Sequence, residues 1–239
     1  FMIIVRRCLL GENLLNNSRK MNSEVSDGYR NVMQLTPETT TEELRKIYSE
    51  WYQDYDKDTD SLEYVGVIIA ATNLVKTLEK FGYGKDATIL DLGCGTGKAG
   101  EELFKLGYRA IDGLDYTSEM LEVAKAKGVY RKLSQGAMGS DGCKDLDMPP
   151  NQYDAAICTG VFSIGHVKGK GFDDLLYVLK PGGLVCFTIR GCVANDPRYG
   201  YEEKMEELSN EGKWKLVVKS YEKYHKDDPM GWQYIYQKL

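Results

Sequence analysis

The feature that most constrains the fold is a glycine-rich turn after a short apolar stretch, in residues 89–100 (ILDLGCGTGKAG). The apolar run at 87–92 predicts a buried strand, and the polar residues from 98 onward predict a helix. Glycines between a strand and a helix let the backbone approach a bound molecule closely. At this point a dinucleotide, a nucleotide phosphate and a sulfonium cofactor all remain candidates.

The rest of the chain repeats this alternation of strand and helix. We expect further strands at 109–115, 130–135, 153–160, 183–190, 214–224 and 231–239, and helices at 98–106, 118–127, 172–180 and 201–212. Such alternation predicts βαβ units and a mostly parallel, Rossmann-like α/β sheet. The linker at 225–231 is too short for a crossover helix, so the last two strands should form an antiparallel hairpin.

The N-terminal part divides into an extension and a helical segment. Residues 1–35 show little periodicity and are interpreted as a flexible extension, with one domain over 36–239. Thr40 and Glu43 have the spacing of a capping box before a helix, and a second helix over 61–81 should stop at Gly82. No stretch approaches the roughly 18 apolar residues of a membrane span, so a soluble protein is expected.

Composition excludes several classes of function. The 31 basic and 36 acidic residues give a net charge of −5 and form no basic stripe, which argues against nucleic acid or an anionic membrane as partner. Six cysteines without a CxxC pair, and only two histidines, make a metal site unlikely to form. Cys158 and Cys186 lie in apolar runs, as buried thiols do, and a reducing cytoplasmic location is expected.

The register of the glycines argues against a dinucleotide. Gly95, Gly97 and Gly100 match the dinucleotide fingerprint, but the strand ends at Leu92 and Gly93 makes the tight turn. The pattern is therefore Asp91-x-Gly-x-Gly-x-Gly. A carboxylate at position 91 would repel a pyrophosphate and would suit an ammonium and a sulfonium. The site chemistry favours S-adenosylmethionine over NAD.

Asp115 ends the next strand, 115 − 91 = 24 positions after Asp91. A carboxylate at this place can accept hydrogen bonds from two ribose hydroxyls. NAD and S-adenosylmethionine both carry that ribose, so Asp115 supports nucleoside binding without choosing between them. The alternative is a surface acid that caps the helix starting near Thr117.

Four segments together resemble the class I S-adenosylmethionine-dependent methyltransferases, over about residues 45–239: ILDLGCGTG, GLDYTSEML, YDAAICTG and LKPGGLVCFT. The helical lead-in and the stretch GVFSIGHV look closest to the Williams–Beuren syndrome region methyltransferase-like proteins. The resemblance implies a seven-stranded, mostly parallel sheet with an antiparallel C-terminal hairpin, helices on both faces, and an N-terminal helical lid over about 36–82.

The resemblance also implies a set of cofactor-binding residues. The glycine loop would face the methionine part of the cofactor, Asp115 the ribose, and Tyr116 and Met120 the adenine. The family's acid after the third strand is absent, so backbone groups and Met138 are expected to hold the adenine. The expected set is Asp91, Gly93, Cys94, Gly95, Thr96, Gly97, Asp115, Tyr116, Met120, Ala137, Met138, Thr159, Gly160 and Val161, with Trp51 and Tyr55 from the lid. Thr159–Val161 have the alternative role of simply ending a strand.

Methyl transfer needs no obligatory catalytic residue, because the donor is already activated. His166 is the candidate general base, since it follows the fourth strand at the ligand-binding edge; the alternative is an ordinary loop histidine. His225 is expected at the surface. Trp51 and Tyr55 would either cover the sulfonium or face the core, and Tyr64 would pack against the same lid.

The loop after the fifth strand carries Arg190, Asn195 and Arg198 and should open on the substrate side. An arginine there would pair with an acidic substrate or be a solvated charge.

Three functions remain open. A methyltransferase acting on a small molecule is favoured, because CTGVF replaces the motif of amino-methylating nucleic-acid enzymes; a protein substrate is a further possibility. A cofactor-binding protein without transferase activity is the second, and an NAD-linked oxidoreductase is the third and least favoured.

Overall fold

The structure is a computed structural model that describes residues 25–225 and 230–239. Its centre is one seven-stranded sheet in the order β3-β2-β1-β4-β5-β7-β6. The strands are β1 (Ile89–Leu92), β2 (Ile111–Asp115), β3 (Lys132–Gln135), β4 (Tyr153–Phe162), β5 (Leu179–Arg190), β6 (Trp214–Lys223) and β7 (Met230–Lys238). The first five run parallel, and β7 is antiparallel to both β5 and β6. The expected fold class and terminal hairpin are confirmed.

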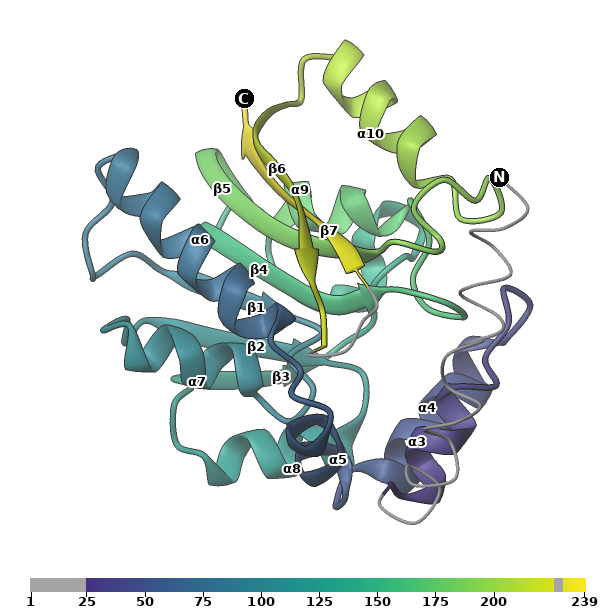
Figure 1. The fold of residues 1–239 in the computed structure, drawn as a ribbon. Helices are drawn as coiled ribbons and strands as arrows, with labels where there is room; N and C mark the ends of the chain where they lie inside the picture. The colour runs from purple at the N-terminus through teal and green to yellow at the C-terminus, as the bar shows by residue number, and fades with distance from the viewer. Residues whose placement is uncertain (1–24, 226–229) are drawn as a thin grey trace.

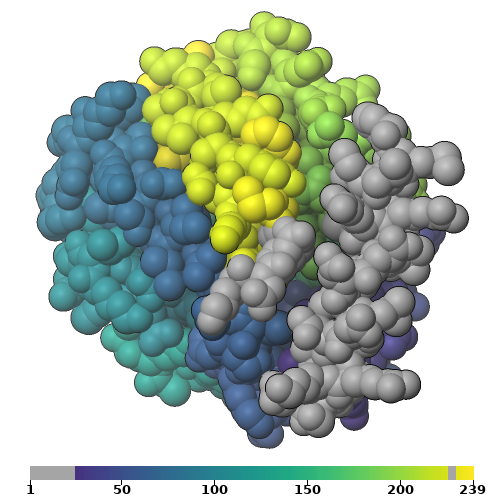
Figure 2. All heavy atoms as spheres, viewed as in Figure 1, coloured from purple at the N-terminus to yellow at the C-terminus, as the bar shows by residue number. Residues whose placement is uncertain are grey.

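Alternating side chains of the strands bury two apolar layers. On one face α6 (Gly66–Lys80) and α7 (Lys98–Lys105) cover a cluster that includes Ile89, Ile157 and Cys186. On the other face α9 (Gly171–Val178) and α10 (Tyr201–Asn210) cover the larger cluster. The helix α8 (Ser118–Ala126) packs beside β2 and β3, and a short 3-10 turn, η1 (Asp141–Leu146), lies against α9. In Figure 2 the yellow hairpin strands meet the blue of α6 at the surface.

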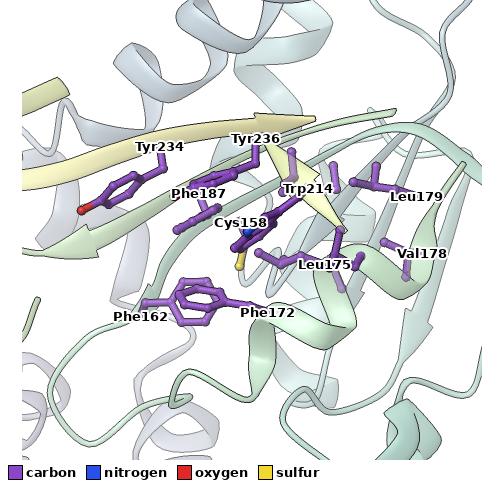
Figure 3. Packing of buried hydrophobic residues seen from close by; sticks show 14 of the residues in the cluster. Cys158, Phe162, Phe172, Leu175, Val178, Leu179, Phe187, Trp214, Tyr234 and Tyr236 are labelled. Carbon is purple, nitrogen blue, oxygen red and sulfur yellow. The ribbon is translucent and has the colours of Figure 1, made fainter. Parts of the chain in front are cut away.

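The larger cluster is dominated by aromatic rings. Phe162 and Phe172 have ring centroids 4.7 Å apart, and Phe187 is stacked on Tyr234 at 5.3 Å. Figure 3 shows these rings gathered between β4, β5, β7 and α9. Burial of this area stabilises the far end of the sheet, where the hairpin packs on β5, α6 and α10.

Three helices before α6 form the lid of the domain: α3 (Asp27–Val32), α4 (Thr41–Trp51) and α5 (Tyr55–Ser61). Figure 1 shows α3 and α4 side by side at one end of the sheet. The capping box at the start of α4 is confirmed, because Thr40 Oγ1 accepts from the backbone N–H of Glu43 while Glu43 Oε2 accepts from that of Thr40. The second predicted helix is shorter than expected and ends at Lys80, with Gly82 following at φ 82°.

The expected extension of residues 1–35 needs a correction at its end. Residues 1–24 lie outside the described residues, but residues 25–35 pack on the domain. Ser26 caps α3, Leu35 is buried, and Gly28 lies so close to Trp51 that a Cβ would be 2.2 Å from its Cγ. This helix could not be predicted from hydrophobic periodicity, because it is only six residues long and none of them is buried.

Among the described residues no single helix is long and apolar enough to cross a membrane; only the pair α5 and α6, bent by 88°, meets that test of length and composition. No group of three or more metal-ligating side chains is present in the same residues.

Candidate functional site

A cavity of about 400 Å³ opens at the carboxyl ends of β1, β2 and β4. This is the edge at which open α/β sheets bind their ligands, and the volume is that of a small-molecule pocket. The lid supplies one wall and the strand ends supply the other. Its lining comprises Thr39, Thr41, Leu44, Tyr48, Tyr55, Gly93, Gly95, Leu114, Asp115, Tyr116, Met120, residues 136–139, residues 159–161, residues 165–168 and Lys170.

The three glycines chosen from the register of the turn all have left-handed backbone. Gly93, Gly95 and Gly97 have φ of 71°, 53° and 93°. A Cβ on Gly93 would stand 2.3 Å from Val161 Cγ2, whereas one on Gly95 would meet nothing within 4 Å. Gly95 therefore presents bare backbone to the open space of the cavity. Gly100 has a different role, because α7 packs there directly against the ring of Tyr130.

Asp115 lines the cavity and is held by the backbone around it. Its Oδ2 accepts a hydrogen bond from Gly95 N–H, and its Oδ1 accepts one from Thr117 N–H, both at 2.9 Å. The residue is only 6% exposed, and burial raises the pKa of its carboxyl. The alternative of a surface acid is wrong, because the residue is buried, although the bond from Thr117 N–H at the start of α8 is present. The carboxylate thus ties the glycine loop to the start of α8 and still faces the cavity.

Asp91 does not reach the cavity. It is buried behind the glycine loop, where its Oδ2 accepts a hydrogen bond from the Tyr130 hydroxyl at 2.6 Å. Its Oδ1 has no partner among the described residues, and burial raises the pKa of this carboxyl to about 7. The structure therefore does not place Asp91 against a cofactor, because β1 turns this side chain toward β2 and Tyr130.

Three other loop residues support the cavity from behind. Cys94 is buried beneath the turn, and Gly97 packs against Tyr130 and Ala124. Thr96 donates its hydroxyl to Asp56 Oδ1 at 2.6 Å and so connects the loop to α5. None of the three is among the cavity-lining residues in the described chain. Spacing alone could not separate them from Gly93 and Gly95, because only the tertiary structure shows which way each loop residue faces.

The two lid aromatics have different roles. Tyr55 lines the cavity, as expected. Trp51 does not: it is buried, its Nε1 donates to Asp58 Oδ2 at 2.8 Å, and its ring lies 4.6 Å from that of Tyr55. Asp58 also accepts hydrogen bonds from Ser26. Trp51 therefore joins α3, α4 and α5, and it supports Tyr55 without contacting the cavity.

The opposite end of the cavity has the residues expected near adenine. Tyr116, Met120, Ala137 and Met138 all line it, and the Tyr116 hydroxyl is buried with no hydrogen-bond partner in the described residues. The loop at 136–139 is held by Asp174, whose Oδ2 accepts from Gly139 N–H at 2.6 Å. This buried acid on α9 was not singled out from the sequence, because nothing near residue 174 marks it as a neighbour of β3.

His166 lines the cavity beside a tyrosine of the lid. Its Nδ1 lies 2.7 Å from the Ile164 carbonyl, and its Nε2 lies 2.8 Å from the Tyr48 hydroxyl. Because a carbonyl only accepts, Nδ1 carries the proton and Nε2 accepts from Tyr48. Burial, with a smaller effect of the positive Arg190, lowers the pKa of His166 to about 4. The imidazole is therefore neutral at pH 7, and its basic nitrogen is already engaged.

Thr159, Gly160 and Val161 line the cavity at the end of β4. Gly160 has φ 76°, and its N–H donates to Thr188 Oγ1 on β5 at 3.1 Å. These residues belong to β4 and also line the cavity, so their contact with the cofactor stays a prediction.

The structure also corrects the prediction for His225 and shows where the residues after β5 lie. His225 is not at the surface but half-buried, with its ring 5.2 Å from that of Tyr64. Tyr64 packs against this histidine and Tyr224 of the hairpin, and its contact with the lid is secondary. Arg190 is partly buried at the end of β5, whereas Arg198 is an exposed charge paired with Asp196 and Glu38. Val193 and Ala194, just before Asn195, belong to the apolar core.

Comparison with known proteins identifies the family of this chain. A family model described as "Methyltransferase domain" matches residues 89–183. The crystal structure of magnesium protoporphyrin IX methyltransferase from Synechocystis with bound S-adenosylmethionine has the same fold, with a TM-score of 0.59 at 14% identity over 82% of this chain and 97% of that chain. Human Methyltransferase-like protein 27 is 35% identical over 176 residues, or 72% of this chain and 68% of its own length.

The chain belongs to the class I S-adenosylmethionine-dependent methyltransferases, and S-adenosylmethionine is its cofactor. The narrower resemblance to the Williams–Beuren region proteins is confirmed by the similarity to human Methyltransferase-like protein 27. The uncharacterized methyltransferase YdaC of Bacillus subtilis is also similar, at 29% identity over 52% of this chain and 70% of that protein.

The residues present fit this cofactor. Bare backbone at Gly95, the buried carboxylate of Asp115 and the unpartnered hydroxyl of Tyr116 supply an open surface, an acceptor and a donor along one wall. The wall contains no basic side chain that would neutralise a pyrophosphate among its β1 and β2 residues. Lys168 and Lys170 are at the other side, on the loop after β4.

Proposed function

We propose that this methyltransferase acts on a small-molecule acceptor that binds between the lid and the carboxyl ends of β4 and β5. The single observation that carries this proposal is the Tyr48–His166 hydrogen bond in the wall of the cavity. It joins α4 of the lid to the loop after β4. A cavity of about 400 Å³ has the size of a small-molecule pocket, and a folded protein segment would enter it only if the lid opened.

When bound, S-adenosylmethionine supplies an activated methyl group on a sulfonium. The chain must then orient the acceptor and exclude water. Tyr48 is fixed for that task, because its proton is donated to His166 Nε2 and its oxygen lone pairs remain available. An acceptor hydroxyl or amine can donate a hydrogen bond to this oxygen. Burial raises the pKa of Tyr48 well above its usual value, so the hydroxyl stays neutral and orients the acceptor.

The carboxyl end of β4 completes the positioning. Thr159, Gly160 and Val161 form the floor of the cavity below the lid, and the Gly160 N–H is fixed by Thr188. Tyr55 covers the cavity from α5 and places an aromatic face where a cation is stabilised by about 0.5–2 kcal/mol. Water exclusion therefore depends on the lid staying on the strand ends.

The expected location and partners remain part of this proposal. Cys94, Cys143, Cys158 and Cys186 are buried free thiols, which supports a reducing, cytoplasmic compartment. The net charge of −5 gives no attraction to nucleic acid or to an anionic membrane.

Calorimetry and a transfer assay test the proposal together. S-adenosylhomocysteine should bind the purified protein and NAD should give no heat. Labelled S-adenosylmethionine is then incubated with a cell extract divided by ultrafiltration, and label should enter the low-molecular-weight fraction. Label in the protein fraction alone would overturn the small-molecule assignment. Tight binding with no transfer to either fraction would favour a cofactor-binding protein without transferase activity.

Two variants address the positioning groups. Tyr48→Phe and His166→Asn should lower kcat/KM for the labelled acceptor by about tenfold or more, while the affinity for S-adenosylhomocysteine changes little. Tyr177→Phe is the matched control, since Tyr177 lies on α9 and does not line the cavity. Unchanged transfer by Tyr48→Phe would exclude the proposed contact with the acceptor.

A further inference from the structure

Beyond the floor of the cavity lies a second group of polar side chains, here called the Arg190 cluster: Tyr64, Arg190, Tyr224 and His225. They come from the turn before α6, the end of β5 and the end of β6. The Tyr64 ring centroid lies 5.4 Å from that of Tyr224 and 5.2 Å from that of His225. The fold thus brings together residues that are up to 161 positions apart (225 − 64).

The polar atoms of this cluster lack partners. The hydroxyls of Tyr64 and Tyr224 and the Nδ1 of His225 are buried without a hydrogen bond in the described residues. The Tyr224 hydroxyl lies near those of Tyr64 and Thr188, and Thr188 Oγ1 already accepts a hydrogen bond from Gly160 N–H. Tyr224 is only 7% exposed. Since an unmade hydrogen bond on a buried polar group costs about 1–3 kcal/mol, three such atoms at one place indicate a ligand that completes them.

The charge of the cluster is also uncompensated. Arg190 forms no ion pair with any carboxylate in the described residues, whereas Arg131 and Arg198 do. Asp58, a buried acid of the lid, is bound by Ser26 and Trp51. Both neighbouring histidines are neutral, because burial and then the charge of Arg190 lower the pKa of His166 and of His225 to about 4. Within residues 25–225 and 230–239, the partly buried guanidinium of Arg190 therefore has no carboxylate as an ion-pair partner.

The cluster borders the acceptor end of the cavity. Gly160 lines the cavity, and a Cβ built on it would lie 3.6 Å from the Tyr64 hydroxyl. Tyr48 and His166, which also line the cavity, are both within the electrostatic reach of Arg190. The Tyr64 hydroxyl is therefore in van der Waals reach of Gly160, a residue of the cavity lining.

We propose that the Arg190 cluster is an anion subsite that binds a carboxylate of the methyl acceptor. This inference rests on the proposed function, because it concerns the same acceptor. A single guanidinium matches the single negative charge of a carboxylate and binds it through two parallel hydrogen bonds. The tyrosine hydroxyls and His225 supply the remaining donors. A phosphate dianion would call for a second cation, and none of the other cluster members is charged.

Benzoate and its neutral isostere benzamide are suitable probes. Each is titrated into the protein with and without saturating S-adenosylhomocysteine, and binding is followed by ligand-observed NMR. Benzoate should bind the S-adenosylhomocysteine complex at least about tenfold more tightly than benzamide. Arg190→Met should remove that preference, Arg190→Lys should restore part of it, and Arg198→Met should leave it unchanged, because Arg198 is exposed and already ion-paired.

The outcomes separate this inference from the proposed function. Equal binding of benzoate and benzamide, or an unchanged preference in folded Arg190→Met, overturns the subsite even if S-adenosylhomocysteine binds normally. Tighter binding of inorganic phosphate than of benzoate overturns the choice of a carboxylate. Failure of S-adenosylhomocysteine to bind the wild-type protein contradicts the cofactor site, whereas a benzoate preference lost in Arg190→Met would still support the subsite.

Discussion

The two walls of the cavity are built in different ways. The cofactor wall consists of the ends of β1 and β2, and its contacts are mostly internal: Gly95 N–H binds Asp115, and Gly93 packs on Val161. The acceptor wall brings Tyr48 from α4 to His166 after β4, and Tyr64 from before α6 to Tyr224 of the hairpin. The first wall uses backbone geometry, and the second uses side chains from distant segments.

This difference has a functional meaning. A wall made of strand ends and glycines is fixed by the sheet itself, as a shared cofactor requires. A wall made of a lid, a loop and a hairpin can change its side chains without disturbing the sheet, as different acceptors require. The walls are joined through Asp56 of α5, which accepts from Thr96 and forms an ion pair with Lys127 at 2.7 Å.

The largest expected effect is on the pH dependence of stability, through Asp91, which is buried behind the glycine loop. Its folded pKa, about 7, is above the unfolded value near 4, so its contribution to stability is full below pH 4 and is lost as pH rises through 7. Between pH 4 and 7 the unfolding free energy of the wild type should therefore fall by up to about 1.4 kcal/mol per pH unit, and that of Asp91→Asn should not show this fall. Urea unfolding of both proteins at pH 5, 6 and 7.5 measures the difference; parallel curves would contradict the assigned pKa.

Replacement of Gly93 tests whether the cofactor wall requires the left-handed backbone and the close packing of this residue. Gly93→Ala should cost about 3 kcal/mol of unfolding free energy, because left-handed backbone and a clash with Val161 add together. Gly128→Ala is the matched control: its φ is 66° but a Cβ there meets nothing within 4 Å, so about 1 kcal/mol is expected. Equal losses in the two variants would show that the close packing of Gly93 is unimportant.

Replacement of Asp115 tests the cofactor wall through the affinity for S-adenosylhomocysteine. Asp115→Ala should weaken S-adenosylhomocysteine binding by at least about 1.5 kcal/mol, through loss of charge-assisted hydrogen bonds. Calorimetry measures this, and Asp112→Ala serves as control, since Asp112 is on the same strand but pairs with Arg131 away from the cavity. A folded Asp115→Ala variant with wild-type affinity would reject the nucleoside role of this carboxylate.

The smallest expected effect is on the contact between the lid and the glycine loop, which Asp56 makes with Thr96. Asp56→Asn should cost about 1 kcal/mol and speed amide hydrogen exchange in α4 and α5, because the lid loses its ion pair with Lys127 and weakens its bond to Thr96. Asp60→Asn should change little, as its side chain is 73% exposed and pairs only with Lys98. If exchange in the lid is the same in both variants, Asp56 does not hold the lid closed.

The sequence by itself determined the sheet and much of the cofactor wall. Hydrophobic periodicity located the strands to within a few residues, and the register of Gly93, Gly95 and Gly97 identified the turn before any ligand was considered. These features are local, because a strand, its turn and the next strand end are set by residues within about thirty positions. Asp115 was found for the same reason.

The direction in which the side chains face, and the contacts between distant segments, could be found only from the tertiary structure. In the structure Asp91 and Thr96 face away from the cavity and Trp51 lies inside the lid. His225, which was predicted at the surface, is half-buried against Tyr64. The Tyr48–His166 bond spans 118 positions, and no periodicity in the chain encodes it. Such contacts follow from the packing of the lid and hairpin on the sheet, which depends on the whole core at once.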